Sequence, residues 1–322
     1  MGDDWWVPLV VIPGFFVMFV ILHYASPCLV VSIFGKRHGD AYENLPSANH
    51  RSYWRRLVRS QVYYIYAGIM GTVLIIVEYR SVEELIFKYN RVLQINLCVA
   101  LSHWLLAVLE DVRSASLLSA DMRHPLIVVG IALIYLVHHA VTIFAFVFII
   151  STNDLSSLGV FGLAFEVPVA IQSFREFSVM MGDCYKKDEL PWFVRQWRDG
   201  SDTTTRPPRS VDVYWFFFFL SILVFRIVPV GLFLYSVAFW QKHLEHLSLV
   251  SKATYYVLGG TFTIANPVYA MLQMAYCMND YSQKTGGDQD IRSVIDFSAF
   301  DNDGDVAFTE NKNSRRPSMN AL

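Results

Sequence analysis

Long apolar runs recur along the chain and alternate with short polar segments. Each run is at least about 18 residues long with almost no charge, which is enough for a helix to cross a hydrocarbon core of roughly 30 Å. Seven spans are predicted, at about residues 5–24, 57–77, 92–109, 126–150, 157–181, 212–240 and 254–278. The pattern therefore predicts an all-α protein, a polytopic transmembrane helical bundle.

Composition and charge distribution agree with this interpretation. Only 17% of the 322 residues are charged and 54% are hydrophobic, whereas a soluble domain carries about 25% charged residues. The N-terminus and the second, fourth and sixth loops hold 5 Lys and Arg; the other loops and the tail hold 19, with Arg59 counted in the preceding loop. Because Lys- and Arg-rich loops face the cytosol, we predict a lumenal N-terminus and a cytosolic C-terminus.

The chain divides into three parts. Residues 1–54 comprise the N-terminus, the first span and a cytosolic loop, residues 55–280 form the main transmembrane domain, and residues 281–322 form a polar tail that we expect to be disordered. Within the tail, Asp301–Asp305 imitates the start of a calcium-binding loop, but the glycine and the final glutamate of such a loop are missing. Calcium binding there stays open.

Polar side chains on five different spans share one depth. An ionisable group inside a span costs roughly 2.5–3.5 kcal/mol and marks a candidate functional site. At a helical rise of about 1.5 Å per residue, five such groups lie roughly 14–21 Å from the lumenal ends of their spans. These groups are His103, His138, Glu166, Arg226 and Asn266. We interpret this level, near the membrane midplane, as the candidate site.

Helical spacing predicts which of these side chains meet. One face of the fourth span carries a polar stripe at spacings i, i+3, i+4 and i+7: Tyr135, His138, His139 and Thr142. Glu166 and Ser173 share a face of the next span, and the loop 151–156 is short enough to make the two helices antiparallel neighbours. We therefore expect the histidine pair to meet Glu166, with Arg226 as the partner of the Glu166 carboxylate.

This arrangement is suited to proton transfer. We predict His138 and His139 as the catalytic base or nucleophile, with Glu166 orienting an imidazole. Tyr135, Thr142, Ser173, Arg226, Asn266 and His103 would bind substrate or support the site. Purely structural packing of these residues is the alternative. Adjacent histidines diverge by about 100° on a helix, so we predict no metal site.

Several segments resemble TLC-domain proteins, the family of TRAM-type proteins, ceramide synthases and small regulators of membrane lipids. "YLVHHAV" resembles the family's histidine pair, which Glu166 follows 27 residues after His139. "EVPVAIQSFREF" resembles its Glu-Leu-Ser-x-Pro-x-x-Asn-x-Arg segment, with Ser173 in place of the usual Asn. "FRIVPVGLFLYS", with Arg226, and "NPVY" resemble two later helices. The resemblance covers about residues 55–280 and implies a six-helix core preceded by one extra helix.

The sequence also departs from the ceramide-synthase branch. Those enzymes carry an Asp at the position of Glu166 and a second Asp where this chain has Val169. The homeobox-like segment of some synthases is absent as well. The resemblance is therefore closer to the small TLC-domain proteins.

The resemblance implies a role in membrane lipid metabolism or homeostasis, in the endoplasmic reticulum or a related membrane. One hypothesis is acyl transfer to a sphingoid or phospholipid acceptor, with acyl-CoA as co-substrate and no bound cofactor. The alternative is a non-catalytic lipid-sensing, trafficking or scaffolding protein, and a seven-span receptor is a minor third. Expected partners are membrane lipids and other membrane proteins, and no nucleic acid.

Overall fold

The computed structural model describes residues 6–45, 48–79, 81–118, 125–182 and 209–284. Within these ranges the protein consists of helices joined by short turns, with no strand, so the predicted all-α bundle is confirmed. The predicted disordered tail and the calcium-like loop at Asp301–Asp305 lie outside the described residues.

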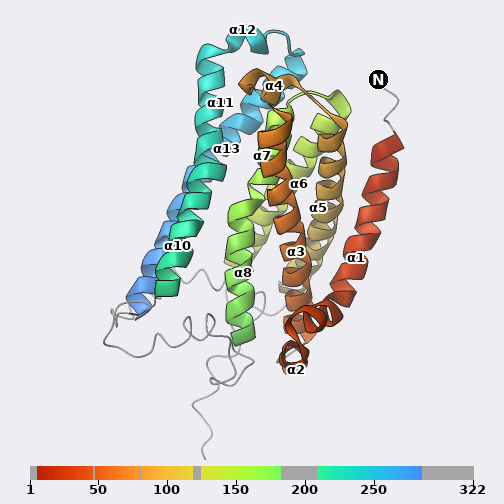
Figure 1. Ribbon diagram of the computed structural model, residues 1–322, viewed down its shortest axis with the longest axis vertical. Helices are drawn as coiled ribbons and strands as arrows, with labels where there is room; N and C mark the ends of the chain where they lie inside the picture. Colours follow the sequence, from red (N-terminus) through yellow and green to blue (C-terminus); the bar gives the residue numbers. More distant parts are fainter. Residues whose placement is uncertain (1–5, 46–47, 80, 119–124, 183–208, 285–322) are drawn as a thin grey trace, which may run out of the picture.

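The first half of the chain forms the side of the bundle that contains the N-terminal helix. Its elements are α1 (Trp6–Phe34), α2 (Lys36–Glu43), α3 (Ala48–Val73), the π-helix η1 (Leu74–Glu78), α4 (Val82–Phe87), α5 (Arg91–Leu118) and α6 (Pro125–Thr152). The long helices run side by side, with the start of α1 and α4 at one end of the molecule and α2 at the other (Figure 1). α5 packs against α1 and α6, whereas α3 packs against α7 and α8.

The second half adds three further passes along the bundle, α7 with α8, α10 with α11, and α13. Its elements are α7 (Ser156–Ala164), α8 (Glu166–Gly182), α10 (Arg209–Ile222), the π-helix η2 (Leu223–Ile227), α11 (Val228–Phe239), α12 (Gln241–Leu244) and α13 (Leu249–Lys284). α7 continues into α8 past a turn at Phe165, and α10 continues through η2 into α11. α11 packs against α13, and α10 packs against α8.

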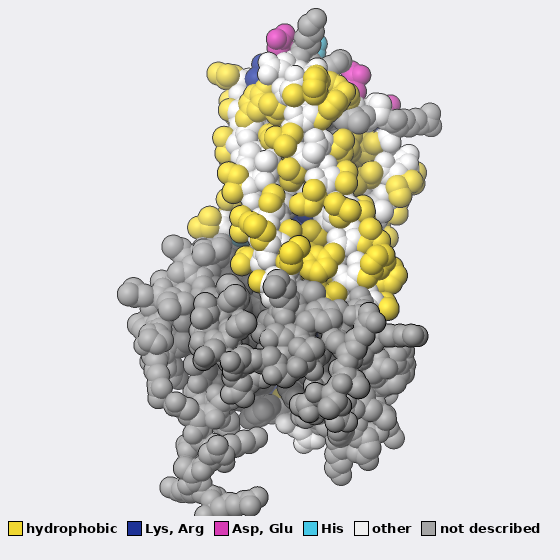
Figure 2. Space-filling view, turned by 90° about the vertical axis from the view of Figure 1, so that its left-hand side faces the viewer, with side chains coloured by type: hydrophobic (Ala, Val, Ile, Leu, Met, Phe, Trp, Pro, Cys, Tyr) yellow, Lys and Arg dark blue, Asp and Glu magenta, His cyan; other side chains and the backbone are white. Residues whose placement is uncertain are grey.

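Within the described ranges, five helical segments are long and apolar enough to cross a membrane: Trp6–Phe34, Arg51–Glu78, Arg91–Val112, Ser156–Arg175 and Val213–Phe239. The described part of α6 contributes a shorter apolar helix, Leu136–Thr152. Each predicted span lies in a helical region, but α13 is not among the five, so the count of seven stays a prediction. Hydrophobic side chains cover most of the described part of the face in Figure 2, and charged ones gather at its end.

Small residues bring α3 close to α7 and α8. A Cβ atom on Gly71 would lie 2.5 Å from the backbone nitrogen of Ala164, and one on Gly68 would lie 2.8 Å from Cγ2 of Val167. Close backbone approach at glycine is a common way for helices to associate in membranes, where van der Waals packing drives association. This contact holds the start of α8, and therefore Glu166, against α3.

Candidate functional site

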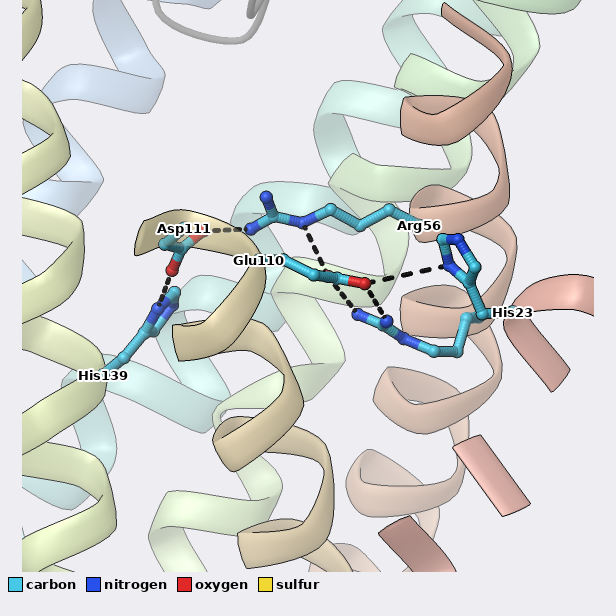
Figure 3. Close-up of polar contacts among 6 residues, drawn as sticks. His23, Arg56, Glu110, Asp111 and His139 are labelled. Atoms are coloured by element: carbon cyan, nitrogen blue, oxygen red, sulfur yellow. Dashed lines mark hydrogen bonds and ion pairs between the residues drawn. The ribbon is translucent and has the colours of Figure 1, made fainter. Parts of the chain in front are cut away.

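A cluster of charged side chains lies where α1, α3, α5 and α6 meet (Figure 3). We call it the charged cluster, and its members are His23, Arg56, Arg59, Glu110, Asp111 and His139. The two arginines lie about one turn apart on α3 and therefore share a face. The two acids are consecutive on α5 and diverge by about 100°, so each reaches different neighbours.

Glu110 joins α5 to α3 and α1. The buried Arg59 guanidinium donates two hydrogen bonds to its carboxylate, one from Nη1 to Oε1 and one of 2.8 Å from Nη2 to Oε2. Arg56 Nε lies 3.6 Å from Oε2, and His23 Nδ1 lies 3.8 Å from Oε1. A bidentate arginine–carboxylate pair is among the strongest polar contacts in proteins, so this half of the cluster ties α5 to α3. His23 Nδ1 on α1 lies nearby without a described hydrogen-bond partner.

Asp111 joins α3 to α6. Its Oδ1 accepts a hydrogen bond of 2.6 Å from Arg56 Nη2, and its Oδ2 lies 2.5 Å from His139 Nδ1. Only 11% of the Asp111 side chain and 8% of the His139 side chain are exposed. The ring of Trp104 lies against the imidazole, with 4.8 Å between centroids. One carboxylate thus bridges a guanidinium and an imidazole inside the bundle.

His138 has different surroundings from its neighbour. It is exposed, whereas His139 is buried, and the two ring centroids are 5.6 Å apart. The Thr142 hydroxyl donates a 3.0 Å hydrogen bond to the backbone carbonyl of His138, so it does not engage the ring. Tyr135 lies in α6, but its side chain is outside the described part. The predicted polar stripe therefore splits, and only His139 contacts a charged partner on α5.

A second polar group surrounds η2. We call it the arginine cluster, and its members are Phe165, Glu166, Gln172, Arg226, Asn266 and Tyr269. Arg226 donates to Asn266 Oδ1 at 3.2 Å and to the Phe165 carbonyl at 3.3 Å. Its guanidinium also lies over the Tyr269 ring, 4.2 Å from the centroid. Arg226 belongs to a π-helical turn, a feature that is frequent at functional sites.

Glu166 is buried at the start of α8. We expected it to meet the histidine pair and to form an ion pair with Arg226. Neither contact occurs among the described residues: His139 pairs with Asp111, and Arg226 makes its hydrogen bonds to Asn266 and a carbonyl. The π-turn aims Arg226 at α13, and α6 packs extensively against α5. Arg226 still acts electrostatically on both Glu166 and His138.

The arginine cluster contains buried polar atoms that no described residue satisfies. Arg226 Nε and Asn266 Nδ2 have no hydrogen-bond partner in the described part of the chain, and neither has Ser173 Oγ, which lies outside the cluster on α8. A guanidinium only donates, so the Asn266 atom that faces Arg226 must be the oxygen. The Asn266 amide nitrogen, on a side chain that is 1% exposed, therefore points elsewhere with its protons unused.

An apolar cleft has Asn266 among its lining residues. It is formed by α4, α7, α11 and α13, and its walls are Leu85, Leu158, Phe161, Phe165, Pro229, Val230, Leu232, Phe233, Tyr255, Gly259 and Phe262. Its two further lining residues, Ser157 and Asn266, each carry a buried polar atom without a described partner. From Tyr255 to Asn266 the cleft follows α13 for about 17 Å at the rise of an α-helix.

His103 lies in the aromatic interior of the bundle. Its ring stacks on Tyr63 at 3.8 Å between centroids and packs edge-on against Phe19 and Trp104. Both His103 Nδ1 and the Tyr63 hydroxyl lack a hydrogen-bond partner among the described residues. The observed contacts of His103 are packing contacts.

The structure thus distributes the predicted residues over two clusters. His139 belongs to the charged cluster, with His138 next to it, whereas Glu166, Arg226 and Asn266 belong to the arginine cluster. The sequence analysis missed Asp111, because it placed the residues after 109 in a loop, although α5 continues to Leu118. A signal was available in the sequence. Glu110 and Asp111 stand at the end of one predicted span, and Arg56 and Arg59 stand at the start of another.

Among the described side chains, no three His, Cys, Asp or Glu residues lie close enough to hold a metal ion. Comparison of the chain with models of protein families, with curated proteins and with solved structures finds no match. The TLC-domain resemblance therefore stays a prediction, and the chemistry of the site is argued from its geometry.

Proposed function

We propose that this chain is a TLC-type integral membrane protein that acts on membrane lipids, and that it transfers an acyl group at an intramembrane site containing His138 and His139. The observation that carries the proposal is the apolar cleft that Asn266, whose amide nitrogen has no described partner, helps to line. An acyl chain needs an apolar wall along its length, and its carbonyl oxygen needs a donor. The cleft offers both.

The length and position of the cleft support an acyl-chain ligand. Its run of about 17 Å along α13 corresponds to roughly half of a 30 Å hydrocarbon core. A buried donor without an acceptor costs about 1–3 kcal/mol, and a ligand oxygen would remove that cost. Arg226, next to Asn266, supplies a positive charge that would stabilise negative charge developing on the carbonyl oxygen.

The histidine pair supplies the proton chemistry. In acyl transfer from acyl-CoA, the amine or hydroxyl of the acceptor attacks the thioester carbonyl and the C–S bond breaks. The proton of the acceptor passes to an imidazole and then to the departing thiolate. In this proposal Glu166 supports the arginine cluster, since Asp111 takes the position beside the imidazole.

The orientation of the chain is part of the proposal. The excess of Lys and Arg in the odd-numbered loops and the tail favours a lumenal N-terminus and a cytosolic tail, in the endoplasmic reticulum or a related membrane. Complete protection of residues 182–211 from protease in sealed microsomes would contradict this orientation.

The direct test uses the full chain in lipid nanodiscs. Radiolabelled long-chain acyl-CoA is supplied with either a sphingoid base or a lysophospholipid, and the acylated product is measured. We expect product with the wild type and a loss of about 100-fold or more with His139→Asn, because an amide cannot accept a proton near neutral pH. The absence of product from wild-type protein with both acceptors would rule out acyl transfer to these two classes.

A non-catalytic lipid-sheltering role is the second candidate. It is favoured by the aromatic packing of Trp104 against both imidazoles, which is an arrangement that also serves stability alone. If His138→Asn and His139→Asn proteins accumulate normally and restore the cellular lipid profile of a deletion strain, the cleft binds lipid without chemistry at the histidines.

A further inference from the structure

The Asp111 carboxylate touches two partners with its two oxygens. Arg56 Nη2 donates to Oδ1 at 2.6 Å, and His139 Nδ1 lies 2.5 Å from Oδ2 (Figure 3). A guanidinium keeps its proton under all conditions met in proteins. A carboxylate at hydrogen-bond distance from it is held in the ionised state, in which it can only accept hydrogen bonds. His139 must therefore carry a proton on Nδ1.

A proton on Nδ1 determines the state of the rest of the ring. In a neutral imidazole one nitrogen donates and the other accepts, so the lone pair is placed on Nε2. The same carboxylate also stabilises the imidazolium that forms when Nε2 takes up a proton, as in the imidazole–carboxylate pairs of hydrolases. The His138 ring has no such partner among the described residues, since Thr142 bonds only to its backbone carbonyl.

We propose that Asp111, held by Arg56, is the positioning residue that fixes the His139 tautomer and makes His139, rather than His138, the proton acceptor of the site. The effect of this positioning on activity rests on the proposed function. The positioning itself does not, because it is a statement about where one proton resides.

The neighbouring Arg56 determines how the new amide is oriented when Asp111 is replaced by Asn. In Asp111→Asn the guanidinium still requires an acceptor, so the new amide oxygen faces Arg56. The amide nitrogen then faces His139 and offers it a donor. The imidazole responds by presenting a bare Nδ1 and moving its proton to Nε2. The variant thus preserves the shape of the site and reverses the tautomer.

Nitrogen-15 NMR of histidine-labelled full-length protein in nanodiscs measures this directly. The His139 signal is assigned by its absence from the His139→Asn spectrum. We expect protonated Nδ1 in the wild type and protonated Nε2 with bare Nδ1 in Asp111→Asn. The matched control is Asp154→Asn, just after the C-terminal end of α6, where Asp154 accepts a hydrogen bond from Ser251; it should leave the His139 signal unchanged. A bare Nδ1 in wild-type protein overturns the proposal.

Kinetics with long-chain acyl-CoA and the better acceptor extend the test. For Asp111→Asn we expect kcat to fall by about 100-fold or more with KM nearly unchanged, because proton transfer is lost while the cleft is intact. Asp154→Asn should retain wild-type kcat. If the tautomer reverses and kcat is unaffected, the role of His139 as proton acceptor is disproved. If the tautomer reverses but the wild type transfers no acyl group, the positioning role stands and the proposed function fails.

Discussion

The two polar clusters both lie among membrane-spanning helices, yet they are satisfied to different degrees. In the charged cluster every carboxylate faces a cation: Glu110 binds Arg59, and Asp111 binds Arg56 and His139. In the arginine cluster Arg226 donates hydrogen bonds to an amide oxygen and a backbone carbonyl and lies over a tyrosine ring. Two donors there, Arg226 Nε and Asn266 Nδ2, have no described acceptor. The charged cluster also has buried nitrogens without described partners, Arg59 Nε and His23 Nδ1, but both its carboxylates are paired. We therefore expect it to hold helices together by itself, and we propose that a ligand supplies the missing acceptors in the arginine cluster.

The largest expected effect comes from breaking the charged cluster. Arg59→Met removes a fully buried cation and leaves Glu110 with only the longer contacts to Arg56 and His23. Uncoupling a buried ion pair costs about 3–5 kcal/mol, so we expect a large drop in thermal stability and in cellular abundance. Thermal unfolding in detergent measures it.

The double variant Arg59→Met/Glu110→Gln is the control for this prediction. It removes the unpaired Glu110 charge as well as the Arg59 cation, so it should recover part of the thermal stability that Arg59→Met loses. Equal stability of the single variant and the wild type would mean that the pair does not hold the bundle together.

A smaller effect is expected from filling the cleft beside the arginine cluster. Val230→Phe adds volume to a cleft wall, while Val228→Phe makes the same change at a lipid-facing position of the same helix. We expect labelling by a photoactivatable long-chain fatty acid to fall about tenfold in the first variant, equivalent to about 1.4 kcal/mol of binding. The second variant should label like the wild type. Equal labelling of the two variants would exclude the cleft as the lipid site.

The smallest effect is expected from Asn266→Leu. Arg226 loses one neutral acceptor but keeps the Phe165 carbonyl and the Tyr269 ring. The lost hydrogen bond is worth about 1 kcal/mol, and the variant also removes an unsatisfied donor. We therefore expect nearly normal thermal stability together with weaker fatty-acid labelling. A stability loss as large as that of Arg59→Met would show that the two clusters have the same structural role.

The helices could be predicted from the sequence because their signal is local. Each apolar run is long enough to be recognised by itself, and α3, α5 and α6 appear where the runs predict them. The break at Phe165 and the π-turn at Arg226 were not predicted, although Pro168 and Pro229 follow them by three residues. A proline inside an apolar run does not by itself show whether the helix breaks, bends or continues. Both features depend on how α7, α8 and α11 pack against their neighbours.

Partner choice at the site could be predicted only in part. The spacing of residues placed His138 and His139 on one helix, and it placed Arg226 and Asn266 at a similar depth in the membrane. It could not determine how each helix is rotated about its own axis. A rotation of one residue, about 100°, decides whether a side chain meets α5 or α8. The pairing of His139 with Asp111 is set by that rotation, so it required the structure.

The ion pair between Arg59 and Glu110 also has a consequence for biogenesis. The two residues are 51 positions apart in the chain, so at synthesis rates of about 5–20 residues per second Arg59 leaves the ribosome roughly 3–10 s before its partner. During that interval the lone Arg59, in the first half of α3, must keep its guanidinium in the headgroup region, as long cationic side chains do. We therefore expect α3 to enter the bilayer fully only after α5 arrives, so that the two helices insert as a pair.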